Sequence, residues 1–173
     1  MEEIIINDCN LTEEDMSMSV IRVKGLIINS KGKILLAHNN NTYQFPGGHA
    51  EENESTDECI LREIKEETGI SVGIQERPFL CISTFDPNYF GTGKKVLNRI
   101  YYYRFMTDDT PNIQETHYDG LELASDFNLF YINYTDLKSF LKNCIKEGTI
   151  DVNIGREMLN VVNVYDKVYG GSL

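Results

Sequence analysis

The sequence predicts an α/β protein in which a mixed β-sheet lies between layers of helices. Runs rich in β-branched and aromatic residues, typical of strands, occur at 20–28, 33–38, 79–85 and 98–107. Apolar residues recur at helical spacing from Thr135 to Gly148, and a last helix is expected over 155–165. The 173 residues are enough for one core, so we predict a single domain, residues 1–173.

The first two strands are expected to form a hairpin, because the turn-forming residues 29–32 separate them. The following segment, Phe45-Pro46-Gly47-Gly48, favours a tight turn in which the backbone approaches a neighbouring element closely.

A helix is predicted next, beginning after Ser55. Ser55 and Glu58 have the spacing of a capping box. The helix should run to about Thr68, and Gly69 is a natural end because glycine adopts the left-handed cap conformation at no steric cost.

Three glutamates of this helix, Glu63, Glu66 and Glu67, stand at positions i, i+3 and i+4, so their carboxylates project from one stripe. Like charges at this spacing repel one another, which predicts a cation there. An all-oxygen cluster favours Mg²⁺ or Mn²⁺ over zinc. The alternative from these residues alone is a solvated acidic helix face.

The surrounding spacing resembles the Nudix box of the Nudix hydrolases. The matching positions are Gly48, Glu54, Arg62, Glu63, Ile64, Glu66, Glu67, Gly69 and Ile70. The resemblance implies the Nudix α/β/α sandwich and Mg²⁺-dependent hydrolysis, with Mn²⁺ as a substitute metal. The expected bond is a diphosphate in a nucleoside triphosphate, nucleotide sugar or ADP-ribose. A non-catalytic Nudix domain that binds or senses nucleotides is the alternative.

The resemblance also implies a ligand set for the metal. Glu63 and Glu67 are expected to be the principal ligands and Glu66 a further one. A backbone carbonyl of Gly47 or Gly48 would add another oxygen.

Arg62 corresponds to an arginine that pairs with a box glutamate, here Glu54, and orients the ligands. Members of the family differ in their general base. It is expected to be Glu63, from the box, or Glu122, from a loop before the last strand, with Glu115 as a second loop candidate. The candidate catalytic residues are Glu63, Glu66, Glu122 and Arg62.

Basic residues outside the box are candidates for contact with substrate phosphates. Lys94, Lys95 and Arg99 lie in or beside a glycine-rich stretch that could close over the cleft, although a solvated hairpin tip is an equal alternative. Arg22 could reach the substrate from its strand. Aromatic residues that could stack on a nucleobase, with core packing as the default, are Tyr43, Phe45, Phe85, Tyr89 and Phe90.

The formal net charge of −11 argues against nucleic acid or an anionic membrane surface as a partner. Four widely spaced cysteines and no apparent signal peptide or membrane span favour a cytoplasmic protein with reduced thiols. The expected partner is a small nucleotide-like substrate. The family resemblance adds a homodimer as an open possibility.

Overall fold

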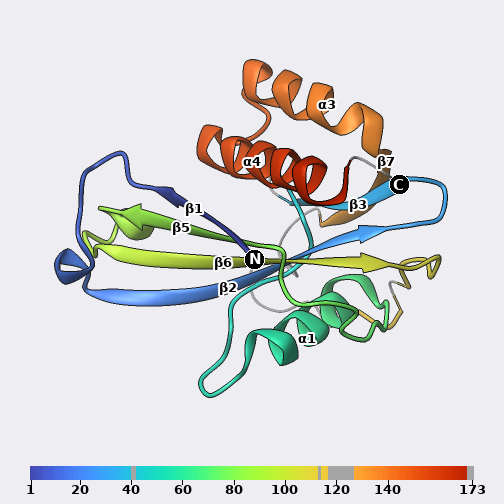
Figure 1. Ribbon diagram of the computed structural model, residues 1–173, viewed down its shortest axis with the longest axis horizontal. Coiled ribbons are helices and arrows are strands. Elements are labelled where there is room, and N and C mark those ends of the chain that lie inside the picture. The colour runs from blue at the N-terminus through green and yellow to red at the C-terminus, as the bar shows by residue number, and fades with distance from the viewer. Residues whose placement is uncertain (40–41, 113, 117–126, 171–173) are drawn as a thin grey trace.

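The computed structural model describes residues 1–39, 42–112, 114–116 and 127–170 (Figure 1). In chain order the elements are β1 (Glu2–Ile6), η1 (Glu13–Asp15), β2 (Met18–Ile28), β3 (Lys33–Asn39), β4 (Thr42–Gln44), α1 (Thr56–Thr68), β5 (Leu80–Asp86), η2 (Tyr89–Gly91), β6 (Val96–Met106), β7 (Asn128–Asn133), α3 (Tyr134–Glu147) and α4 (Val152–Tyr169).

These strands form a mixed sheet, as predicted. The order is β1-β5-β6-β2-β3-β4, and β7 pairs with β3. Strands β1 and β5 are parallel, as are β2 and β6, whereas β5–β6, β2–β3, β3–β4 and β3–β7 are antiparallel. The long β2–β6 pair runs from Met18 opposite Val96 to Ile28 opposite Met106 and forms the centre of the sheet.

Helices cover both faces of the sheet, which confirms the α/β/α sandwich: α1 lies on one side, and α3 with α4 on the other (Figure 1). Alternate residues of β2 serve the two cores because successive side chains of a strand point to opposite faces. Val23 and Ile27 belong to the α1 core, and Leu26 and Ile28 to the α3/α4 core.

The segment 46–50 runs along the edge of β2 that β6 leaves free. Three backbone hydrogen bonds anchor it: Val23 N to Gly48 O at 3.0 Å, Gly25 N to Pro46 O at 2.8 Å and Ala50 N to Ile21 O at 3.0 Å. Gly47 has φ +133°, and a Cβ there would collide with the carbonyl oxygen of Val23. The predicted close backbone approach is therefore present, and it fixes the loop that leads into α1.

Candidate active site

Helix α1 begins and ends as the sequence predicts. The hydroxyl of Ser55 accepts a hydrogen bond from Glu58 N at 3.2 Å, and the Glu58 carboxylate accepts one from Ser55 N at 3.0 Å. Gly69 takes a left-handed cap conformation with φ 70°. These caps fix the register of the glutamate stripe relative to the loop 46–50.

Arg62 lies at the centre of the acidic residues. Its Nε and Nη2 donate to the two oxygens of Glu54 at 2.8 and 2.9 Å, so the predicted pair is present and bidentate. Its Nη1 donates to Glu63 Oε1 at 3.0 Å and to Glu66 Oε2 at 2.9 Å. Nη2 also reaches the carbonyl of His49 at 3.1 Å. One guanidinium thus connects three carboxylates with the glycine-containing loop.

The charges of this network shift the pKa values of its side chains. Hydrogen bonding to Arg62 lowers the pKa of Glu54 to about 2, and the same bond raises the pKa of Arg62. Glu63 behaves differently: its partial burial raises the pKa of its carboxyl group, although Arg62 opposes the shift.

Glu63 and Glu67 pack against the two glycines of the loop. Glu67 is 2% exposed, and its Oε2 accepts a hydrogen bond from Gly47 N at 2.8 Å. A Cβ on Gly48 would lie 2.5 Å from the Cδ and both oxygens of Glu63. The absence of a side chain at Gly48 therefore makes room for the Glu63 carboxylate.

The two glycine carbonyls have different partners. Gly48 O accepts from Val23 N in the pairing with β2. Gly47 O accepts from the ammonium of Lys24 at 2.9 Å, and Lys24 Nζ also donates to Gln44 Oε1 at 3.0 Å. Gly47 O therefore already faces a cation, whereas Gly48 O is used within the sheet.

Lys24 is 3% exposed on β2. Burial is the main cause that lowers its pKa to about 8, and the negative charges of Glu67 and Glu157 oppose that shift. The ammonium donates to two carbonyl oxygens, and nearby carboxylates offset part of the cost of burying its charge.

The donor set suits a hard divalent cation, because carboxylate and carbonyl oxygens from Glu63, Glu66, Glu67 and Gly47 border one loop. Within the described residues, no three histidine, cysteine, aspartate or glutamate side chains converge on one point. Arg62 is one reason why these carboxylates do not converge, because its Nη1 binds Glu66 and one oxygen of Glu63.

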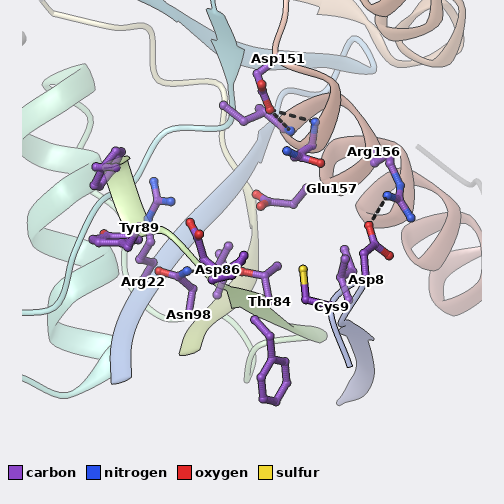
Figure 2. A pocket seen from close by; sticks show the side chains of 17 residues that line it. Asp8, Cys9, Arg22, Thr84, Asp86, Tyr89, Asn98, Asp151, Arg156 and Glu157 are labelled. Atoms are coloured by element: carbon purple, nitrogen blue, oxygen red, sulfur yellow. Dashed lines mark hydrogen bonds and ion pairs between the residues drawn. The ribbon is translucent and has the colours of Figure 1, made fainter. Parts of the chain in front are cut away.

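A cavity of about 560 Å³ lies on the α4 face of the sheet (Figure 2). Arg22 of β2 lines it, as expected for a residue that meets substrate, together with Asp86, Asn98 and Glu157. Tyr89 at its rim lies 3.4 Å from His49, measured from Oη to Nε2.

Because His49 directly follows Gly48, this contact joins the loop of the box to the cavity. Burial and the positive charges of Arg22 and Lys24 lower the pKa of His49 to about 4, so its imidazole is neutral at pH 7.

Three other basic residues predicted to meet substrate lie outside this cavity. Arg99 is next to Asn98 on β6, and strand alternation directs its side chain to the opposite face. There it donates to Glu13 at 2.9 Å and to Ser19 at 3.1 Å. Lys94 and Lys95 belong to the β5–β6 connection and are not among the lining residues. The substrate contacts expected of all three are therefore absent from this cavity.

The two loop candidates for the general base differ in what the structure describes. Glu115 forms an ion pair with Lys65, and its other oxygen accepts from Asn112 Nδ2 at 2.9 Å. Lys65 does not belong to the Arg62 network, so Glu115 lies apart from the glutamate stripe. Glu122 lies outside the described residues.

Sequence reasoning missed the polar residues of the cavity. Asn98 stands between the apolar residues Val96 and Ile100 on one face of β6, and this break in the apolar pattern was the available signal. Asp86 and Glu157 carried no such signal, because acidic residues at a strand end or on a helix are ordinary.

Fold and site together define an α/β/α domain in which a capped glutamate helix meets a glycine loop at a strand edge. Residues 18–140 match the family model of the NUDIX domain, so the chain belongs to the NUDIX domain family.

The chain is similar to the RNA pyrophosphohydrolase of Pasteurella multocida (strain Pm70), with 44% identity over 48 residues. That match spans 27% of this chain and only 24% of the relative. The MutT protein from Methanosarcina mazei Go1 has a similar fold, with a TM-score of 0.55 at 20% identity over 86% of this chain and 96% of that one. A UDP-X diphosphatase gives 0.53 at 20% identity over 88% of this chain and 64% of that one. No helix in the described ranges has the length and apolar character needed to cross a membrane.

Proposed function

We propose that the protein is a Mg²⁺-dependent pyrophosphohydrolase that cleaves a diphosphate bond in a small nucleotide-like substrate. The observation that carries this proposal is the Arg62 network, in which one guanidinium orients Glu54, Glu63 and Glu66 beside the glycine loop. A solvated acidic helix face has no need for such a network. Proteins similar to this chain are named as a pyrophosphohydrolase and as a diphosphatase, in agreement with this chemistry.

The metal would be held by Glu63 and Glu67, with Glu66 as a further ligand. We favour the carbonyl of Gly47 over that of Gly48, because Gly47 O already faces the Lys24 ammonium. Bound Mg²⁺ neutralises charge on the phosphate oxygens and lowers the pKa of the attacking water.

The chain's own residues would contribute positioning and charge. Arg62 would hold the carboxylates in one orientation and relieve their mutual repulsion. Arg22 lines the cavity on the α4 face, and Lys24 lines with it a second pocket of about 30 Å³; both would offset the negative charge of the diphosphate.

Glu63 is our preferred general base among the described residues. A base must lie close to the attacking water, and the Glu63 carboxylate packs against Gly48 in the loop beside the proposed metal site. Glu122 is the alternative. If Glu63 is the base, Glu63→Gln lowers kcat and removes the acidic limb of the pH–rate profile, whereas Glu122→Gln leaves both unchanged.

Product release from a panel of nucleoside triphosphates, nucleotide sugars and ADP-ribose, with and without Mg²⁺, tests the proposal. The informative variant is Glu67→Gln, with Glu147→Gln, an exposed acid at the end of α3, as the matched control. We expect Mg²⁺-dependent turnover that Glu67→Gln abolishes and Glu147→Gln retains. Ligand-induced stabilisation with no product from any compound would instead indicate a non-catalytic binding domain.

A further inference from the structure

The cavity on the α4 face is built partly from segments outside the part of the chain that matches the NUDIX domain. That match covers residues 18–140. Asp8 and Cys9 precede it, and the α4 residues Ile154, Arg156 and Glu157 follow it. Figure 2 shows Arg156 and Glu157 of α4 across from the sheet residues Asn98, Asp86 and Thr84, with Asp8 and Cys9 next to Thr84. The cavity therefore combines strands of the matched domain with flanking segments, and its volume of about 560 Å³ suits a ligand of nucleoside size.

Two polar atoms among the lining residues lack partners. Asn98 is 6% exposed, and within the described part of the chain its Oδ1 accepts no hydrogen bond. Its Nδ2 makes one long contact, 3.4 Å to Thr84 Oγ1. The Nε of Arg22 is also buried without a partner among the described residues. Buried polar groups are normally hydrogen-bonded, so these atoms point to a ligand that completes them.

Two of the side chains that line the cavity with Asn98 are hydrogen-bond acceptors, and the guanidinium of Arg22 is a donor. Carboxylates of Asp86 and Glu157 lie on two sides of the cavity (Figure 2). Glu157 accepts a hydrogen bond from the hydroxyl of Tyr102, and Asp86 accepts one from Asn88 N at 2.8 Å. A ligand that presents N–H donors to Asn98 Oδ1 and these carboxylates gains hydrogen bonds, whereas a carbonyl oxygen in that place meets other oxygens and finds its donor only at Arg22.

An aromatic pair borders the same cavity. The rings of Tyr89 and Phe90 have centroids 4.3 Å apart. Phe90 is 79% exposed and has φ 47°, an uncommon conformation for a bulky residue. Strained, exposed residues of this kind cluster at ligand sites. Their flat faces suit a planar ring system better than a sugar.

We infer that this cavity binds a nucleobase carrying an exocyclic amino group, and that Asn98 recognises that group through its unpartnered Oδ1. The expected ligands are therefore nucleotides of cytosine, adenine or guanine. Each should bind better than the nucleotide whose base carries a carbonyl oxygen or a hydrogen in place of the amino group. The inference rests on the proposed function in one respect: it assumes that the diphosphate of the ligand lies near Arg22 and the box.

A measurement of stability can distinguish a role of Asn98 in ligand recognition from a purely structural role. Removing a buried polar group that has no partner does not destabilise a protein as removal of a bonded one does. Asn98→Leu has a similar size, so its Tm should equal or exceed that of the wild type. A purely structural asparagine would give a lower Tm instead.

The test compares three matched pairs of nucleotides: CTP with UTP, ATP with ITP, and GTP with ITP. Two quantities are measured for each: kcat/KM with Mg²⁺, and Kd by calorimetry without Mg²⁺. Wild type, Asn98→Leu and the control Asn143→Leu, an exposed asparagine of α3, are compared. In the pair that the protein accepts best, we expect the wild type and the control to prefer the amino base about 10- to 100-fold. Asn98→Leu should lose that preference and keep its Tm.

The outcomes distinguish this inference from the proposed function. A Kd preference for the amino base without any turnover would support the cavity assignment and contradict the hydrolase. Turnover with ratios within about twofold in every pair would overturn the cavity assignment alone. An unchanged preference in Asn98→Leu would overturn the role of Asn98, as would a lower Tm with the preference kept.

Discussion

The two sides of the sheet differ in how fully their polar groups are paired. On the α1 side, Arg62 donates to Glu54, Glu63 and Glu66, and Glu67 accepts from the glycine loop. On the α4 side, Asn98 keeps a buried oxygen without a partner in the described part of the chain. A paired network holds its geometry before any ligand arrives, whereas unpaired groups gain their partners from the ligand. The α1 side is thus organised for one reaction, and the α4 side for selecting what enters.

The largest expected effect is on the α1 side. Glu67→Gln removes a buried carboxylate from the proposed metal site, and charge stabilisation by a metal is worth several kcal/mol. We expect kcat/KM to fall about 10³-fold for every substrate alike, measured by initial rates at saturating Mg²⁺. If Glu67→Gln changed the order in which the protein prefers its substrates, the α1 side would also take part in substrate selection, contrary to this account.

Gly48→Ala should come next. The added methyl group would lie 2.5 Å from the Glu63 carboxylate and displace it from the loop. We expect kcat/KM to fall about 10²-fold, because misplacing a catalytic group by about 1 Å has a cost of this order. Gly73→Ala is the matched control, since nothing lies within 4 Å of a Cβ at that position. Equal rates in the two variants would show that the Glu63–Gly48 contact is unimportant for turnover.

Arg62→Lys tests the network with the charge retained. Lysine cannot reproduce the fork that holds Glu54 through two hydrogen bonds while reaching Glu63 and Glu66. Loss of such an orienting group typically lowers metal affinity or activity 10- to 100-fold. The Mg²⁺ concentration for half-maximal rate should rise accordingly. Arg77→Lys, at an exposed position, serves as the control, and a normal Mg²⁺ dependence of Arg62→Lys would count against the orienting role.

The contrast between the two sides also explains what the sequence could predict. The box occupies one continuous stretch, so the cap at Ser55 and the Glu63–Glu67 stripe follow from spacing, and the Arg62–Glu54 pair follows from the resemblance to the Nudix box. The sheet, its first hairpin and the α1 bounds were likewise predictable. Strand β1 was missed, and α4 begins at Val152 rather than at 155, because Asp151 caps it through Asn153 N and Ile154 N.

The cavity could not be predicted in this way. It brings together β2, β5, β6, α4 and the segment after β1, and their adjacency depends on the strand order. The direction of the Arg99 side chain depends on the fold in the same way. A basic residue beside a glycine-rich stretch favoured phosphate contact, but the pleat of β6 turns Arg99 away from the cavity that contains Asn98.

The smallest expected effect is a pH dependence of stability. The Glu54 carboxyl group has a pKa of about 2 in the folded protein, below its usual 4.5, because Arg62 pairs with it, so this pairing stabilises the fold above pH 4.5. This contribution is lost as the pH falls from 4.5 through 2. The Tm difference between wild type and Glu54→Gln, without metal, should shrink over that range. A constant difference would contradict the ion pair as its source.

The central claim is that the box carries out the reaction and the α4-side cavity selects the substrate. The most direct test is the ratio of kcat/KM for CTP over UTP, or the better-accepted purine pair, in wild type, Glu67→Gln and Asn98→Leu. We predict that Glu67→Gln lowers both rates about 10³-fold and leaves the ratio unchanged, while Asn98→Leu moves the ratio toward one. A changed ratio in Glu67→Gln together with an unchanged ratio in Asn98→Leu would contradict the account.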